Sequence, residues 1–534
     1  MKIKKNINKY KNLYVKFFTV LFLLILYFVI YKIYIPRVNA FGCFDDCNNF
    51  MGGYFLLHGK KLFSQIFFNH NPFMAYISLL IQYFTNPQNL YELILRHRQF
   101  LLVFGFIFNL ILVFRFGVPV LGFTLFYELT KFYLFGDRFL AEGFIVYPLV
   151  YLVGLAFFKF NKIIIKKWEY IFSAILAWFI IFTREPYVPI ALILFFYVIW
   201  DRKVRKNILN PLLIFSLLSF FTIIYHNIGE FYFNVVTVNI TTNFLTEAKS
   251  TGLLSFDLIK LFLYPINIFF GGTWNFFRYI LVSLDALFVL SSVVLIYKGK
   301  WKLILFLYII LGFLNLRYVN PGTTYYAAFH MLCWYGAFLF LSFMMLSLVF
   351  KINKKVSYLL ILLYAGIFVY NIMSPSSFIN FKANSYEEFI TNYGVQLQVG
   401  TVVNKLSKPT DTLFLDGFDD IIYWQAQRLS PYKYSWYTSL MPYFKKYTDA
   451  RITMFKSQPP DFYYGSCPKE KDANRLLPKF IKDDYIRLLD DSKPSCLFIN
   501  KEKLLTISKN QWKMAAESLY TLPKSANPTT TTSN

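Results

Sequence analysis

Residues 17–34 read FFTVLFLLILYFVIYKIY, a predominantly apolar run that follows a basic stretch, Lys2 to Lys16. A helix of about 20 apolar residues is long enough to cross the roughly 30 Å hydrocarbon core of a bilayer. The run is longer than the core of a typical signal peptide and lacks a small-residue cleavage site, which favours a retained transmembrane helix. Comparable runs recur along the chain, so the sequence predicts a polytopic α-helical membrane protein.

The composition agrees with this class. Hydrophobic residues make up 57% of the chain, charged residues only 16%, and the mean hydropathy is +0.44. Much of the net charge of +26 lies in five Lys and Arg clusters, which we place inside because cytoplasmic loops carry the positive excess. The clusters are Lys2 to Lys16, Lys159 to Lys167, Arg202 to Lys206, Lys298 to Lys302 and Lys351 to Lys355. The charge therefore indicates topology and contact with anionic membrane lipid, with no nucleic acid as a partner.

Placing all five clusters inside requires an even number of membrane crossings between each neighbouring pair of clusters. Eleven transmembrane helices satisfy this condition, and the last helix then leads to the outside. The helices are expected at 17–34, 99–114, 117–134, 139–158, 169–183, 187–200, 210–226, 278–297, 303–316, 326–350 and 355–373. This arrangement gives a membrane module, residues 1–373, with a cytoplasmic N-terminus, and puts residues 374–534 outside the plasma membrane. Two shorter runs, Phe73 to Phe84 and Ile259 to Phe270, are expected as juxtamembrane or re-entrant helices in external loops.

The external part has the composition of a small soluble α/β domain. TLFLDGF (412–418) and SCLFIN (495–500) have strand-like patterns. EEFITNYGVQLQVGTVV (387–403) and NRLLPKFIKDDYIRLL (474–489) have helical ones. The tail ANPTTTTSN (526–534) is expected to be disordered.

Acidic residues are scarce in the membrane part, because residues 1–373 contain thirteen Asp and Glu against 34 Lys and Arg. Glu169 and Asp201 adjoin inner basic clusters, so we expect ordinary cytoplasmic surface charges there. Glu128 lies three residues from Lys131 within a predicted helix, a spacing at which the two side chains form a structural pair.

The adjacent carboxylates of Asp45 and Asp46 are the best lead to function. They lie in FGCFDDCNNF (41–50), directly after the first helix, where the chain meets water on the outer side. A surface turn or a helix N-cap is the simpler interpretation of such a pair. Asp285 lies inside a predicted span, where a charge is costly, and has no local partner.

The continuation GGYFLLHGKKLFSQIFFNHNPFMAYISLL (52–80) resembles the glycosyltransferase C superfamily. The likeness is to protein O-mannosyltransferases, aminoarabinose transferases and Rgt-like bacterial enzymes, in which an acid in the first external loop precedes a helix of the form YxxxxG and an Asn- or Pro-rich return to the membrane. Tyr54, Gly59, Asn71 and Pro72 occupy the matching places.

Two later segments extend the resemblance to roughly residues 15–350. RFLAEGFIVYPLVYLVGL (138–155) is similar to the family segment in which an acid begins a helix, with Glu142 at that position and Asp137 as the alternative. LRYVNPGTTYYAAFHMLCWYGAFLF (316–340) is similar to the late segment with an Arg and a Tyr, matching Arg317 and Tyr325, although the usual His-Tyr pair and following Pro are absent.

This resemblance implies an inverting transferase that moves a sugar from a polyprenyl-phosphate donor to a hydroxyl of a cell-envelope glycan, a lipid or a protein on the outer face. Such a reaction needs a base at the acceptor and cations at the departing phosphate. Asp45 is the expected general base, Asp46 its alternate, and Glu142 would orient the acceptor or hold a divalent cation with Asp45. The residues expected to bind the donor are Arg98, Arg138, Arg184, Arg317 and Tyr325.

Simpler interpretations remain for these residues. Glu142 fits an ordinary carboxylate at a helix N-terminus, and each arginine fits a side chain reaching the membrane interface. The alternative functions are a transporter or flippase for polyprenyl-linked glycans and a non-catalytic glycan-binding membrane protein. The sequence has no Walker loop or GxGxxG fingerprint, which disfavours an ATP-driven transporter and a cytoplasmic sugar-nucleotide transferase.

The external cysteines predict disulfides on an oxidising face of the membrane. Cys467 with Cys496 is the more plausible pair, and a bridge between Cys43 and Cys47 would constrain the two carboxylates between them.

Overall fold

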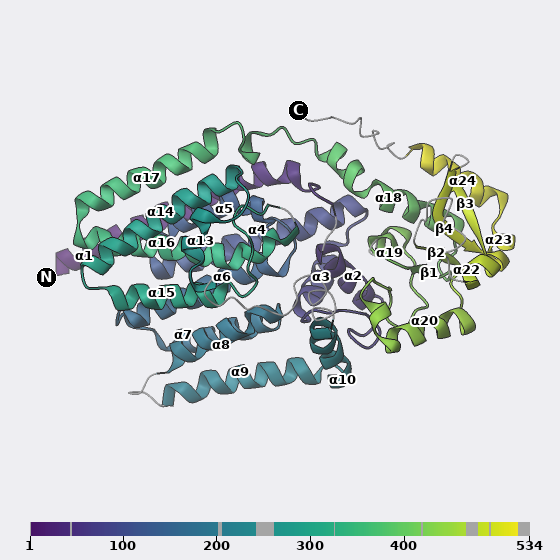
Figure 1. Cartoon of the computed structure of the whole chain (residues 1–534), viewed down its shortest axis with the longest axis horizontal. Helices are drawn as coiled ribbons and strands as arrows, with labels where there is room; N and C mark the ends of the chain where they lie inside the picture. Colours follow the sequence, from purple (N-terminus) through teal and green to yellow (C-terminus); the bar gives the residue numbers. More distant parts are fainter. Residues whose placement is uncertain are drawn as a thin grey trace. The chain divides into compact units, whose positions relative to one another are not determined.

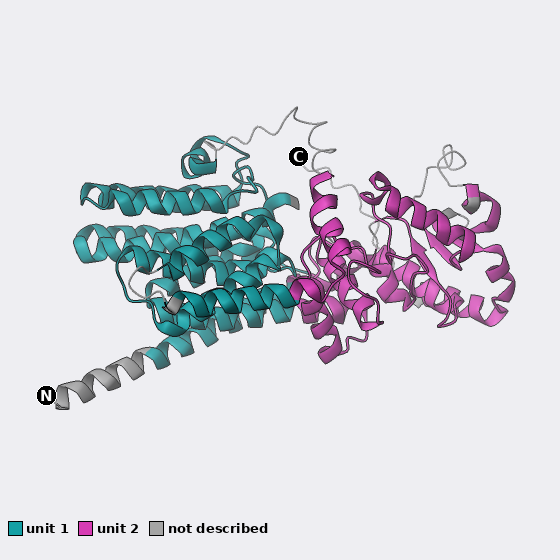
Figure 2. Cartoon of the chain, turned by 90° about the horizontal axis from the view of Figure 1, so that it is seen from below, with its two compact units in different colours: residues 1–36, 98–221, 255–383 teal, residues 37–97, 222–254, 384–534 magenta. Residues whose placement is uncertain are grey.

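The computed structural model describes residues 2–42, 45–200, 206–241, 261–324, 326–417, 420–465, 479–490 and 493–521, and it is mostly helical (Figure 1). It divides into two compact units, coloured separately in Figure 2. The first unit consists of Met1–Pro36, Arg98–Phe221 and Ser255–Ala383. The second consists of Arg37–His97, Thr222–Leu254 and Asn384–Asn534, so it joins parts of the predicted membrane module to the C-terminal segment.

The first unit is a helical bundle. Its main helices are α1 (Lys2–Tyr34), α4 (Leu90–Phe116, whose first residues belong to the second unit), α5 (Pro119–Thr130), α6 (Ala141–Phe160), α7 (Lys167–Ile181), α8 (Val188–Ile199), α9 (Lys206–Ile224), α13 (Tyr264–Phe270), α14 (Phe276–Tyr297), α15 (Trp301–Leu314), α16 (Leu332–Ile352) and α17 (Lys354–Met373). In Figure 1, α5 and α14 run beside α16, which also packs on α6. Glycines allow the close approach, because a Cβ at Gly336 would collide with Val146 of α6.

In the described part of the chain, six helices are long and apolar enough to cross a membrane, which agrees with a membrane protein. They are Lys16–Arg37, Leu90–Phe116, Ala141–Phe160, Phe276–Tyr297, Ala327–Ile352 and Lys354–Asn380. A seventh results if the bent pair Ile208–Ile224 and Ile228–Thr241 is counted as one span. The prediction of eleven spans is therefore not supported.

The other predicted spans form helices, but most of them are too short. α5 and α8 have 12 residues each, α15 has 14 and α7 has 15. At 1.5 Å per residue, a 12-residue helix extends only about 18 Å. Proline limits α5 and α8, because Pro119 and Pro189 occupy their first turns, where proline starts a helix and cannot continue an earlier one.

The predicted pair of Glu128 and Lys131 is confirmed, and it forms part of a larger buried network. The two side chains are fully buried and 2.5 Å apart. The Glu128 carboxylate also accepts hydrogen bonds from Tyr27 at 2.9 Å, Tyr147 at 2.7 Å and Asn109 at 3.0 Å. These donors come from α1, α6 and α4, so this carboxylate ties four helices together.

Glu169 is not a surface charge, which corrects the sequence-based expectation. Its side chain is fully buried, forms a two-pronged ion pair with Arg115 and accepts a hydrogen bond from Tyr151 at 3.1 Å. It also accepts from the backbone of Lys166, which closes a capping box at the start of α7. Asp201 lies outside the described residues.

Asp285 is fully buried within α14. Among the described residues, neither of its carboxylate oxygens has a hydrogen-bond partner.

The second unit contains a four-stranded sheet with the order β1-β2-β4-β3. The strands are β1 (Leu413–Leu415), β2 (Phe462–Tyr464), β3 (Tyr485–Asp490) and β4 (Lys493–Asn500), of which β1 and β2 are parallel and the others antiparallel. Both predicted strands are confirmed. The predicted helix at 474–489 is wrong in its last part, because α22 ends at Asp484 and the chain then pairs with β4 as a hairpin.

The second unit also contains helices, of which α22 and α23 contact the sheet. Its helices are α2 (Asp45–Leu57), α3 (Phe73–Thr85), α10 (Ile228–Tyr232), α18 (Ser385–Leu406), α19 (Ile421–Ala426), α20 (Lys445–Ser457), α22 (Lys479–Asp484), α23 (Lys501–Thr506) and α24 (Lys509–Thr521). The run at 73–84 thus forms a short helix, as expected, and packs on α2 through Gly52 and Gly53, where added Cβ atoms would collide with α3. The tail at 526–534 lies outside the described residues.

Cys47 and Cys496 are both disulfide-bonded, as the sequence predicted. Their predicted partners, Cys43 and Cys467, lie outside the described residues. Cys333 is a buried free thiol in α16.

Candidate functional site

A buried group of arginines and carboxylates lies at the N-terminal end of α6 in the first unit. The chain reaches this point through a tight turn, in which Phe135 has a left-handed backbone and Leu140 is extended before the helix begins. Glu142 occupies the first turn of α6, where the helix dipole favours a negative charge. Its side chain is only 1% exposed.

Two arginines from distant parts of the chain converge on Glu142. Arg317, which follows α15, approaches the Oε1 atom with its Nη1 at 3.0 Å, and Arg184, which precedes a short 3₁₀ turn, approaches with its Nε at 3.4 Å. The Arg184 side chain is 6% exposed and that of Arg317 is 25% exposed. Both predicted arginines therefore share one carboxylate oxygen, with one of them still reachable by solvent or ligand.

A second ion pair is close to the same helix end. Arg98 on α4 lies 3.5 Å from Asp137, with both side chains nearly buried. Arg138 is fully buried, and its guanidinium lies 5.1 Å from the centre of the Phe135 ring. Asp137 thus pairs with Arg98, while Glu142 holds the two arginines from further along the chain.

We call this group of residues, Arg98, Arg138, Arg184 and Arg317 with Asp137 and Glu142, the arginine cluster. Arg98 pairs with Asp137, Arg184 and Arg317 share Glu142, and Arg138 lies beside the Phe135 ring. Guanidinium groups match the oxygen geometry of phosphate, so the arginine cluster is suited to a phosphate group.

The predicted acidic pair lies in the second unit, at the start of α2. Asp45 is 37% exposed, and its Oδ2 lies 3.9 Å from Nε2 of His70, whereas Asp46 is fully buried. The two carboxylates therefore have different surroundings: Asp45 is open to solvent and beside an imidazole, and Asp46 is enclosed by the fold. Of the two residues, Asp45 is the one whose carboxylate is exposed.

The structure thus brings together Glu142, Arg184 and Arg317, and separately Arg98 and Asp137. Tyr325 lies outside the described residues. Within the part of the chain that the structure describes, no three His, Cys, Asp or Glu side chains are grouped so as to hold a metal ion.

Two neighbours of Glu142 carry no sequence signal of their own. The Cys333 thiol lies 3.9 Å from the backbone oxygen of Glu142, and Tyr187, buried beside this region, donates to the backbone of His330 at 3.4 Å. Both belong to apolar helical segments, where a Cys or Tyr has the pattern of an ordinary core residue. Comparison with protein-family models, curated proteins and solved structures finds no match to the chain.

Proposed function

We propose that this protein is an integral membrane glycosyltransferase of the glycosyltransferase C type, which moves a sugar from a polyprenyl-phosphate donor to an acceptor hydroxyl. The observation that carries the proposal is the convergence of Arg184 and Arg317 on buried Glu142, beside helices long enough to span a membrane. A lipid-linked phosphate needs both a buried cationic site and access to a bilayer, and this combination supports such a donor.

The proposed reaction assigns one role to each group. The acceptor hydroxyl oxygen attacks the anomeric carbon while its proton passes to Asp45, and the bond between that carbon and the phosphate oxygen breaks, with inversion. The released polyprenyl phosphate carries the negative charge that Arg184 and Arg317 stabilise. Asp45 is preferred to Asp46 as the base because it is the exposed member of the pair.

Glu142 is better suited to positioning than to metal binding. Two guanidinium groups already compete for its Oε1 atom, and their charges disfavour a divalent cation at the same place. We therefore propose that Glu142 positions the guanidinium groups of Arg184 and Arg317 to bind the phosphate.

The test is transfer of radiolabelled sugar from a panel of polyprenyl-phosphate sugars by the purified full chain, in the presence of native-membrane extract. Asp45→Asn should reduce turnover by about 10²–10⁴-fold, the usual contribution of a general base. Asp449→Asn, which changes an exposed acid of the same unit, is the matched control and should keep wild-type activity. Full activity of the Asp45 variant would exclude that residue as the base.

The arginine cluster has a control of its own. Arg98→Gln is compared with Arg96→Gln, because Arg96 lies on the same helix but is exposed. The first should impair use of the donor and the second should not. If no donor supports turnover by folded protein, the transport or glycan-binding alternatives are favoured instead.

A further inference from the structure

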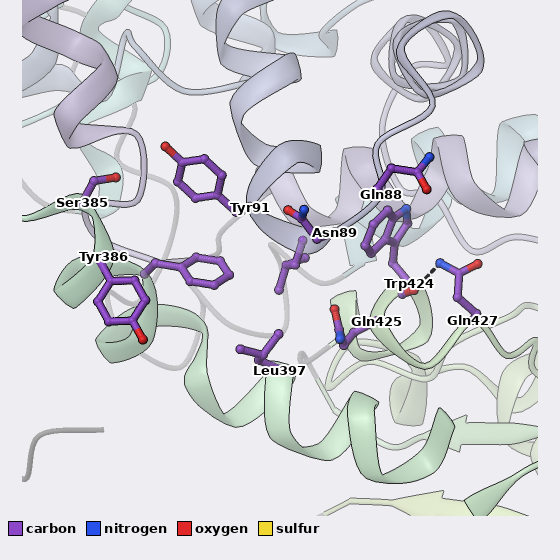
Figure 3. A pocket seen from close by; sticks show the side chains of 11 residues that line it. Gln88, Asn89, Tyr91, Ser385, Tyr386, Leu397, Trp424, Gln425 and Gln427 are labelled. Atoms are coloured by element: carbon purple, nitrogen blue, oxygen red, sulfur yellow. Dashed lines mark hydrogen bonds between the residues drawn. The ribbon is translucent and has the colours of Figure 1, made fainter. Parts of the chain in front are cut away.

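A pocket of about 580 Å³ lies within the second unit, apart from the carboxylates of α2. It is formed by the segment that leads into α4, the first half of α18 and the end of α19 (Figure 3). Ligand sites commonly have volumes of about 300–1,000 Å³, so the pocket is large enough for a small organic molecule.

The lining of this pocket is uncharged, and it combines a mostly apolar surface with several side-chain amides. Four side-chain amides contribute to it, those of Gln88, Asn89, Gln425 and Gln427, and we call it the amide pocket. None of its eleven lining residues, all in the described part of the chain, is Asp, Glu, Lys, Arg or His. In a chain with a net charge of +26, an uncharged pocket of this kind selects against ionic ligands.

Each glutamine amide is fixed by a hydrogen bond from its nitrogen. Gln88 Nε2 donates to the Asn86 backbone oxygen at 2.8 Å and Gln425 Nε2 donates to Thr401 at 3.1 Å. Gln427 Nε2 donates to the backbone oxygen of Trp424 at 2.6 Å, the bond drawn in Figure 3. The carbonyl oxygens of these three amides are left to accept hydrogen bonds from a ligand.

Asn89 has the opposite polarity. Its Oδ1 accepts from the backbone nitrogen of Glu92 at 2.9 Å, so its amino group remains to donate. The amide pocket thus offers several fixed acceptors and one double donor. Hydroxyl groups, which donate and accept at the same oxygen, complement such a set.

Aromatic rings complete the pocket. In Figure 3 the four amides lie on the side of Trp424, and Tyr91 and Tyr386 lie on the other. The Tyr91 ring meets the Phe389 ring edge to face, with centres 5.8 Å apart. Rings of this kind present an apolar face with a polar edge, which suits the alternating C–H and O–H surface of a sugar ring.

Other ligand classes fit less well. An acyl chain would leave the remaining acceptors and the Asn89 amino group of the pocket unused, and a phosphorylated ligand would find no cation among the lining residues. An extended peptide binds most readily along an exposed strand edge, and no strand contributes to this pocket. We propose that the amide pocket binds a short neutral oligosaccharide; that this sugar is the acceptor for transfer rests on the function proposed above.

The test is calorimetric titration of the full chain in lipid nanodiscs, because sugar-headed detergents would compete for the pocket. The probes are neutral trisaccharides of glucose, galactose, mannose and N-acetylglucosamine, with an oligogalacturonate, a neutral tripeptide and a short fatty acid for comparison. Gln88→Ala and Gln425→Ala each remove one acceptor and should weaken binding about fivefold to tenfold. Gln458→Ala, at an exposed glutamine outside the pocket, should bind as the wild type does.

The outcomes separate the two proposals. Binding of a neutral trisaccharide that weakens in both pocket variants supports the inference, whether or not transfer is ever detected. Absence of binding by every neutral trisaccharide, equal binding by the pocket variants, or preferred binding of the tripeptide or fatty acid would overturn it. If transfer occurs and the pocket variants leave the acceptor KM unchanged, the amide pocket is not the acceptor site although the transferase proposal stands.

Discussion

Replacing Glu142 with Gln would remove the common partner of buried Arg184 and partly exposed Arg317 while preserving the shape of the side chain. At an effective dielectric constant of about 20, charges 3.0 and 3.4 Å apart attract each other by about 5 kcal/mol per pair, before the opposing cost of desolvation. Removing one partner of a buried pair typically costs about 3–5 kcal/mol, because the other charge is left uncompensated. Most of this loss in the free energy of unfolding should come from Arg184, whose side chain is far less exposed than that of Arg317.

The comparison with Arg184→Gln sharpens this prediction. That change leaves Glu142 paired with Arg317, so it should cost only about 1–2 kcal/mol. Glu142→Gln should also raise the affinity for inorganic pyrophosphate, because the carboxylate no longer competes with pyrophosphate for the two arginines. Relief of roughly 1.4 kcal/mol of this competition corresponds to about a tenfold gain in affinity. The free energy of unfolding is measured by denaturant titration in mixed micelles, and pyrophosphate binding by calorimetry. A loss below 1 kcal/mol for Glu142→Gln, or a larger loss for Arg184→Gln, would refute the idea of a shared counter-ion.

Three further predictions concern stability, each measured by the same unfolding titration. Lys131→Met should lower the free energy of unfolding by about 3–5 kcal/mol, because it leaves the buried Glu128 carboxylate without its cation. Adding Glu128→Gln should recover most of that loss. Equal losses in the single and double variants would contradict the pairing. Burial lowers the pKa of Lys60 from 10.5 to about 8 in the folded protein. Between these two pH values the unfolded chain binds more protons than the folded chain, so the free energy of unfolding should rise with pH across that window. The rise should be absent from Lys60→Met, and an identical pH profile for that variant would disprove it. Gly53→Ala should cost about 1–3 kcal/mol, because its Cβ would approach atoms of α3 to 2.6 Å, whereas Gly366→Ala, in open space within α17, should be neutral or stabilising.

The long apolar runs were predictable because their signal is local. α1, α14 and α17 coincide closely with the predicted spans, since a run of about 20 apolar residues has few other stable arrangements. The count of eleven is not supported because apolar composition does not determine helix length. α5 and α8 are as apolar as the longer helices, but each has a proline in its first turn and only 12 residues.

Contacts between distant residues were beyond prediction from one sequence. Glu169 was expected at the surface because basic residues adjoin it, but its partner Arg115 comes from 54 positions earlier in the chain. Glu142 and Arg317 were each identified by resemblance, yet their contact spans 175 positions. The amides of the amide pocket have no charge or spacing pattern, so only the fold shows that they lie together.

Two buried carboxylates of the first unit, Glu128 and Glu142, differ in their partners. Glu128 has one cation, Lys131, at its Oε2 atom and three neutral donors at its Oε1 atom, so one cation faces its one negative charge. Glu142 instead holds two cations with a single charge, one of them partly exposed. The Arg317 side chain is partly exposed, so an anion can approach its guanidinium while Glu142 holds it. Guanidinium groups match the oxygens of a phosphate, which is why the arginine cluster, and not the Glu128 network, is where we would look for the phosphate of the proposed donor.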